Sequence, residues 1–99
     1  MRAVAPPLPD LVLYTRPGCH LCDEARDAIQ SVLEDRATRG LPNPRRIERD
    51  IDRDPDLQSA YGPTIPVVVL GEARLDLAVS AGRIRRLLSQ VLDEGVKLA

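Results

Sequence analysis

Two cysteines are the residues whose type and spacing point most directly to chemistry. Cys19 and Cys22 are the only cysteines of the chain, and two residues separate them. A pair with this spacing can exchange a disulfide with another molecule, or it can supply two thiolate ligands to a metal ion. Disulfide exchange needs a thiolate on one cysteine and a second cysteine within its reach. The elements around the pair therefore decide what it can do.

The pair lies where a buried strand is expected to turn into an amphipathic helix. The apolar run 11–14 is closed by a turn with Pro17 and Gly18, which predicts a central strand. Apolar residues recur at helical spacing from Leu21 to Leu33, and the helix should end near Gly40. The first turn of a helix has unpaired N–H groups and favours negative charge. We therefore expect a thiolate at Cys19.

The charges near Cys19 determine how far its pKa falls. The helix dipole contributes roughly 0.3–1 kcal/mol, which is less than one pKa unit. Arg16 adds a positive charge, whereas Asp23 and Glu24 oppose the thiolate if they turn towards it. We expect a lowered but not a very low pKa, with Cys19 as the nucleophile and Cys22 as the resolving cysteine.

His20 lies between the cysteines and has two open interpretations. It could shuttle a proton or, when protonated, stabilise the thiolate, and it could equally be an exposed residue at the start of a helix. Tyr14 and Tyr61 could line a groove or pack in the core. Three arginines, Arg83, Arg85 and Arg86, are expected on a solvated helix face.

The remaining elements predict an α/β domain with the order β-α-β-α-β-β-α. This order gives a mixed four-stranded sheet with helices on both faces. Asp54 should cap the short second helix, Ser80 should cap the last one, and Ile47 should face the core. Residues 1–10 are expected to be a flexible tail and residues 11–95 the domain. The elements after the first helix are expected at residues 45–51, 55–61, 65–70, 73–79 and 81–95.

Composition excludes several classes of function. With 99 residues and a formal net charge of −1, the chain is one domain without a field that would attract nucleic acid or a membrane surface. The first nine residues are too rich in proline for a signal peptide, and no apolar run could span a bilayer. We expect a cytoplasmic monomer without a metal or resident cofactor, in a compartment where a close cysteine pair is reduced.

Two segments resemble the glutaredoxins and a family of small bacterial glutaredoxin-like proteins. These are Leu13-Tyr14-Thr15-Arg16-Pro17-Gly18-Cys19-His20-Leu21-Cys22 and, some forty residues later, Thr64-Ile65-Pro66. The resemblance covers the whole chain. It implies a thioredoxin-like fold, thiol–disulfide oxidoreductase activity and a cis proline at Pro66 beside the cysteines.

The resemblance also implies how a substrate binds. Arg16 stands where glutaredoxins meet a glutathione carboxylate, and Thr64 and Ile65 stand where the backbone holds the glutathione peptide. Departures are the His-Leu pair between the cysteines and the segment 78–82, which lacks the paired glycines and acidic residue of glutaredoxins. The expected substrate is a small thiol or a protein disulfide, with glutathione as a candidate co-substrate.

Three alternatives to catalysis remain open on the sequence. The cysteines could hold a metal or an iron–sulfur cluster between two copies of the chain, because one copy adds only His20 as a further ligand. The protein could be a non-catalytic adaptor that binds a partner through Pro66 and a sheet edge. The cysteines could also be buried small hydrophobic residues.

Overall fold

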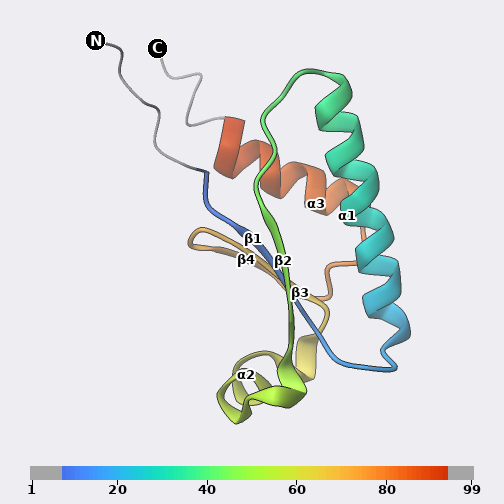
Figure 1. Ribbon diagram of the computed structural model, residues 1–99, viewed down its shortest axis with the longest axis vertical. Coiled ribbons are helices and arrows are strands. Elements are labelled where there is room, and N and C mark those ends of the chain that lie inside the picture. Colours follow the sequence, from blue (N-terminus) through green and yellow to red (C-terminus); the bar gives the residue numbers. More distant parts are fainter. Residues whose placement is uncertain (1–7, 94–99) are drawn as a thin grey trace.

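The computed structural model describes residues 8–93 and contains one mixed sheet (Figure 1). The strand order is β2-β1-β3-β4, with β1 parallel to β2 and antiparallel to β3, and β3 antiparallel to β4. The predicted order β-α-β-α-β-β-α and the mixed sheet are confirmed. The elements are β1 (Leu11–Thr15), α1 (His20–Thr38), β2 (Arg46–Asp50), α2 (Pro55–Tyr61), β3 (Val67–Leu70), β4 (Ala73–Leu75) and α3 (Ala81–Leu88).

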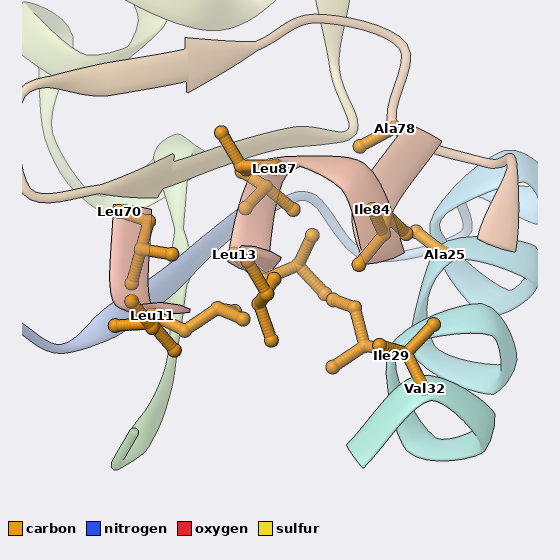
Figure 2. Packing of buried hydrophobic residues seen from close by; sticks show 12 residues of the cluster. Leu11, Leu13, Ala25, Ile29, Val32, Leu70, Ala78, Ile84 and Leu87 are labelled. Atoms are coloured by element: carbon orange, nitrogen blue, oxygen red, sulfur yellow. The ribbon is translucent and has the colours of Figure 1, made fainter. Parts of the chain in front are cut away.

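The core lies between one face of the sheet and the pair of helices α1 and α3. In the sheet, Leu11 pairs with Leu70 and Leu13 with Val68, and all four side chains are fully buried. Figure 2 shows Leu11, Leu13 and Leu70 against Ile29 and other apolar residues of the two helices. Burying a leucine or isoleucine side chain contributes about 1.5–3 kcal/mol. This core fixes the direction of β1, whose carboxyl end leads to the cysteines.

The opposite face of the sheet is covered less completely. Strand alternation places Val12 and Tyr14 there, and both are half-buried. Ile47 pairs with Val12, so the prediction that Ile47 faces the main core is wrong. Glu48 pairs with Leu13 in the ladder and lies on the side of α1, where Arg26 neutralises its carboxylate. This ion pair compensates the cost of a carboxylate beside the helix.

Helix α2 lies at one end of the sheet, at the bottom of Figure 1, and it has no buried residue. It begins as predicted, with the Asp54 side chain accepting the Asp56 N–H at 2.9 Å and Pro55 in the first turn. Its last residue, Tyr61, stacks on Tyr14 with 4.0 Å between ring centroids and 16° between planes. The two tyrosines therefore pack on each other and hold α2 against the second face of the sheet.

The hairpin strands are shorter than predicted. β3 begins at Val67 instead of Ile65, because Pro66 has no N–H with which to continue the ladder. β4 ends at Leu75 instead of Val79. Leu77 leaves the extended conformation with φ 49°, and its N–H donates to the Thr64 carbonyl at 3.0 Å. That hydrogen bond lies outside the ladder with β3.

The last helix also differs from the prediction. Ser80 caps α3 as expected, since its hydroxyl accepts the Arg83 N–H at 3.3 Å. The α-helix ends at Leu88 and continues as a π-helical turn over Ser89–Asp93, whereas one helix to Gly95 was predicted. Gly95 lies outside the described residues.

Both ends of the described chain are attached to the domain. Leu8 packs against the core, and the Asp10 carboxylate pairs with Arg45 at 3.0 Å. Residues 1–7 of the predicted tail lie outside the described part. At the other end, the buried guanidinium of Arg36 pairs with Asp93 at 2.9 Å.

Candidate active site at the amino end of α1

The turn between β1 and α1 places Cys19 at the amino end of the helix. Gly18 has φ 74°, a conformation that costs glycine little and other residues more. Cys19 is the N-cap, and its sulfur accepts the Cys22 N–H at 3.1 Å. A helix N–H therefore points at the sulfur expected to carry negative charge.

The two sulfurs differ in their access to solvent. Cys19 and Cys22 are joined as a disulfide with 5.2 Å between their Cα atoms. Cys22 is fully buried, whereas Cys19 is half-buried. An incoming thiol or disulfide can therefore reach Cys19 and not Cys22.

Arg16 is held in a salt bridge beside the cysteine turn. Its Nε and Nη2 atoms donate to the Asp52 Oδ1 at 3.2 and 3.1 Å, and the two side chains are 40% and 44% exposed. Asp52 follows β2 in a 3₁₀ turn, Ile51–Arg53, and the parallel pairing of Thr15 with Asp50 brings the two strand ends together. Nothing in the sequence marked Asp52 as this partner. At such exposure the pair is exchangeable, so Arg16 remains available to a ligand anion.

The acidic residues near Cys19 are directed to other partners. The Asp23 carboxylate pairs with Arg26 of the next turn. Glu24 lies 3.6 Å from the Nε2 of His20, whose side chain is 88% exposed. Asp23 and Glu24 were expected to oppose a thiolate only if they turned towards the sulfur, and each has an alternative contact on α1.

A hydrogen-bond and ion-pair network fixes α1 against the two strands. Arg26 donates from Nε to Oε1 of Glu48 at 2.9 Å and from Nη2 to Oε2 at 2.6 Å. The Thr15 hydroxyl donates to the same Oε2 at 3.1 Å. The pKa of Glu48 is lowered, first by the hydrogen bonds from Arg26 and then by the one from Thr15, against the opposing effect of burial. The network joins the last residue of β1 to the first turns of α1 and so holds the cysteine turn between them.

The stretch Thr64–Pro66 lies beside the same turn. Tyr14 is opposite Val67 in the ladder, so the residues before β3 run along those that follow β1. The peptide bond between Ile65 and Pro66 is cis. Arg16, Cys19 and the stretch 64–66 thus belong to the same end of the sheet, the lower end in Figure 1.

Backbone hydrogen bonds hold this stretch and leave one group open. The Thr64 and Pro66 carbonyls accept the N–H groups of Leu77 and Ala78 at 3.0 and 2.8 Å. Between them, the Ile65 carbonyl receives no hydrogen bond from the residues that the structure describes. It is therefore an available acceptor for an extended ligand.

Arg74 supports the stretch from β4, a role that sequence reasoning missed. Its Nη2 donates to the Ala60 carbonyl at 3.2 Å and to the Thr64 hydroxyl at 3.4 Å. Its guanidinium carbon lies 4.8 Å from the centroid of the Tyr61 ring. The only signal in the sequence is that Arg74 lies in the predicted hairpin.

Within residues 8–93, no three His, Cys, Asp or Glu side chains gather as ligands of one metal ion. Over the same range, no helix has the length and apolarity needed to cross a membrane.

The fold and the site together define the class. A β2-β1-β3-β4 sheet, with Cys-x-x-Cys at the amino end of the helix that follows the central strand, is a thioredoxin-like arrangement. Residues 10–94 match the model of the Glutaredoxin-like domain (DUF836), and the chain belongs to this glutaredoxin-like family.

Solved structures show the same fold. The chain is similar to the structural genomics target protein XcR50 from X. campestris, with 33% identity, a TM-score of 0.67 and coverage of 81% of this chain and 96% of that one. A structure described as a malarial protein has 17% identity, a TM-score of 0.61 and coverage of 83% and 94%, and it shows the fold alone. No curated protein matches the sequence.

Proposed function

We propose that the protein is a thiol–disulfide oxidoreductase of the glutaredoxin-like type, with Cys19 as nucleophile and Cys22 as resolving cysteine. The observation that carries this proposal is the difference between the two sulfurs. Cys19 is accessible and accepts a helix N–H at 3.1 Å, while its disulfide partner Cys22 is fully buried. A hydrogen bond to the sulfur favours the thiolate over the thiol when the pair is reduced.

The reaction runs in two exchanges. In the reduced protein, the Cys19 thiolate attacks a substrate disulfide, a bond forms between Cys19 and one substrate sulfur, and the other sulfur leaves and takes up a proton. Cys22 then loses its proton and attacks the Cys19 sulfur, so that the mixed disulfide breaks and the second substrate thiol is released. The substrate gains two electrons and the protein becomes the Cys19–Cys22 disulfide. An external thiol returns two electrons to it.

The residues around the pair supply the binding contacts. Ile65 offers its open carbonyl to an extended substrate, and the hydrogen bonds at the Thr64 and Pro66 carbonyls hold Ile65 in place. Arg16 can exchange Asp52 for a substrate carboxylate. His20 modulates the thiolate from the exposed side of the helix. Glutathione is the reductant to test first, and the substrate is a small or protein disulfide. The protein works as a monomer in the reducing cytoplasm, without a resident cofactor or metal.

Alkylation tests the assignment of the nucleophile. The rates of iodoacetamide modification at Cys19 and Cys22 are measured by mass spectrometry in the reduced protein between about pH 4 and 9. Cys19 should react first, with an apparent pKa below the free value of about 8.5. If both cysteines react as ordinary or buried thiols, the assignment is wrong and the adaptor interpretation is favoured.

Two serine variants test the two roles. Cys19→Ser should abolish reduction of a small disulfide such as hydroxyethyl disulfide. Cys22→Ser should still form the mixed disulfide, which accumulates and is visible as added mass. Equal activity of both variants and the wild type would contradict catalysis by this pair.

A further inference from the structure

A basic groove lies between α3 and the edge strand β4. Its volume is about 280 Å³. Every charged residue in its lining is an arginine, and two leucines and a glutamine complete it: the residues are Arg74, Leu75, Arg83, Arg86, Leu87 and Gln90. Apolar side chains between cationic ones suit an extended chain that carries both apolar and acidic residues.

Two of these arginines lie on α3. Arg83 is in the first turn of α3, where the helix dipole disfavours a cation and where no acidic residue is present. Arg86 follows three positions later on the same side of the helix, a spacing at which like charges repel. Among the described residues neither has an ion-pair partner, whereas Arg74 is paired with Asp76 at 2.6 Å. Arg86 stands in the last turn of α3, which favours a cation, but Arg83 is at the unfavourable end of the helix and is repelled by Arg86. An acidic ligand between the two arginines would relieve both effects.

The groove and the stretch beside the proposed exchange site share Arg74. Arg74 lines the groove and also donates to the Thr64 hydroxyl at 3.4 Å, directly before Ile65. The chain that follows Leu77, whose N–H binds the Thr64 carbonyl, leads through Ser80 into α3. A substrate that pairs with the Ile65 carbonyl and passes Arg74 on the edge strand β4 would come to the arginines of α3.

Charge on the other side of the cysteines has the opposite sign. The first two turns of α1 carry Asp23, Glu24 and Asp27, all exposed. Because the net charge of the chain is only −1, electrostatic attraction of a partner has to come from local groups of charged side chains. The arginines of the groove attract acidic residues, whereas these carboxylates of α1, of which Asp23 is paired with Arg26, do not.

We propose that this groove, lined by Arg83, Arg86 and Arg74, is the docking surface for an acidic segment of a protein disulfide substrate. The proposal rests on the oxidoreductase function proposed above and names the substrate class. The acidic side chains pair with Arg83 and Arg86 while the segment's backbone passes beside Arg74 towards Ile65. Such complementarity contributes selectivity and association rate.

Kinetics with matched peptides test the proposal. Three peptide disulfides share one sequence, except that the residues flanking the disulfide are all Glu, all Gln or all Lys. We compare the wild type with the double variant Arg83→Glu/Arg86→Glu. The matched control is Arg85→Glu, an exposed arginine of the same helix that does not line the groove. Circular dichroism verifies that each variant is folded.

The wild type should reduce the Glu peptide with a kcat/KM several times that for the Gln peptide, and the preference should fall with added salt. In the double variant, kcat/KM should fall about tenfold for the Glu peptide, rise for the Lys peptide and stay unchanged for hydroxyethyl disulfide. The tenfold figure follows because two surface charges are reversed and each is worth a few-fold. Arg85→Glu should have little effect. Equal rates for the three peptides, or equal effects of Arg85→Glu and the double variant, would overturn the proposal.

Binding separates this proposal from the proposed function. Fluorescence anisotropy reports the affinity of the oxidised protein for a labelled, cysteine-free Glu peptide and its Gln counterpart. Tighter binding of the Glu peptide, lost in the double variant, supports the docking surface even if no disulfide is reduced, in which case the oxidoreductase proposal fails alone. Reduction of all disulfides without preferential binding overturns the docking surface and leaves the oxidoreductase proposal standing.

Discussion

The buried ion pair between Arg36 and Asp93 should be a main determinant of stability. The Arg36 side chain is only 4% exposed and that of Asp93 is 27% exposed. Two hydrogen bonds join Arg36 to the carboxylate at 2.9 and 3.0 Å, a third goes to Asn43 Oδ1 at 3.2 Å and a fourth to the Pro42 carbonyl at 2.7 Å. One side chain therefore ties the end of α1 to the following loop and to the last described turn.

Removal of one member should cost a large part of the free energy of unfolding. Breaking a buried pair costs about 3–5 kcal/mol. Because water reaches Asp93, we expect Arg36→Met to lower the free energy of unfolding by about 3 kcal/mol, the lower end of this range. That loss corresponds to a fall in Tm of roughly 12–24 °C. Asp93→Asn keeps one acceptor for the guanidinium and should cost about 1.5 kcal/mol.

The pH dependence gives an independent test. The pKa of Asp93 is lowered below 3.8, chiefly by the hydrogen bonds from Arg36. A carboxyl whose pKa is lower in the folded state stabilises the protein above its unfolded pKa and loses that effect as the pH falls through its folded pKa. The difference in stability between the wild type and Asp93→Asn should therefore be complete at pH 7 and shrink below about pH 4.

Urea unfolding followed by circular dichroism measures these effects. The matched control is Arg39→Met, which removes an exposed pair with Asp35 at 3.3 Å, with side chains 65% and 42% exposed. It should stay within about 0.5 kcal/mol of the wild type. If Arg36→Met is as mild as Arg39→Met, or if the Asp93→Asn difference is the same at pH 7 and pH 3, the structural argument is refuted.

Two further predictions concern the site. Asp52→Ala removes the acceptor of Arg16 and should lower the KM for a glutathione mixed disulfide by about two- to threefold at unchanged kcat, the scale of one exposed ion pair. An unaltered KM would show that Arg16 does not meet the substrate carboxylate. Leu77→Gly should leave the free energy of unfolding within about 1 kcal/mol of the wild type. Glycine relieves the strain of the positive φ, and this gain offsets two losses: the greater entropy of the unfolded chain and the removal of a side chain that is 47% exposed. The control is Leu75→Gly in β4, which should lower the free energy of unfolding in urea by about 2 kcal/mol. Equal losses in the two variants would contradict strain at Leu77.

Local patterns were sufficient where the cause is local. The strand at Leu11, the start of α1 near Cys19, the cap at Asp54 and the cap at Ser80 are all as predicted. Each depends on side-chain periodicity or on a hydrogen bond within three residues. The location of the cysteine pair at the amino end of α1 follows from the same kind of information.

Partners distant in sequence could not be predicted. Asp52 meets Arg16, Glu48 meets Arg26, and Asp93 meets Arg36 across 36, 22 and 57 residues. A charged residue has many possible partners in a sequence, and strand register and helix packing select one. The same reason explains Ile47, whose side of the sheet depends on register alone.

The sequence by itself determined the order of the elements, the family resemblance and the placement of Cys19 and Cys22 where a helix begins. Only the tertiary structure decided that Cys22 is buried while Cys19 is reachable. It also decided that the Leu77 N–H binds the Thr64 carbonyl outside the hairpin ladder, and that Arg74 contacts both Thr64 and the groove on α3. These features arise from the close approach of segments far apart in the chain. Periodicity and local propensity contain no information about which segments approach each other in this way.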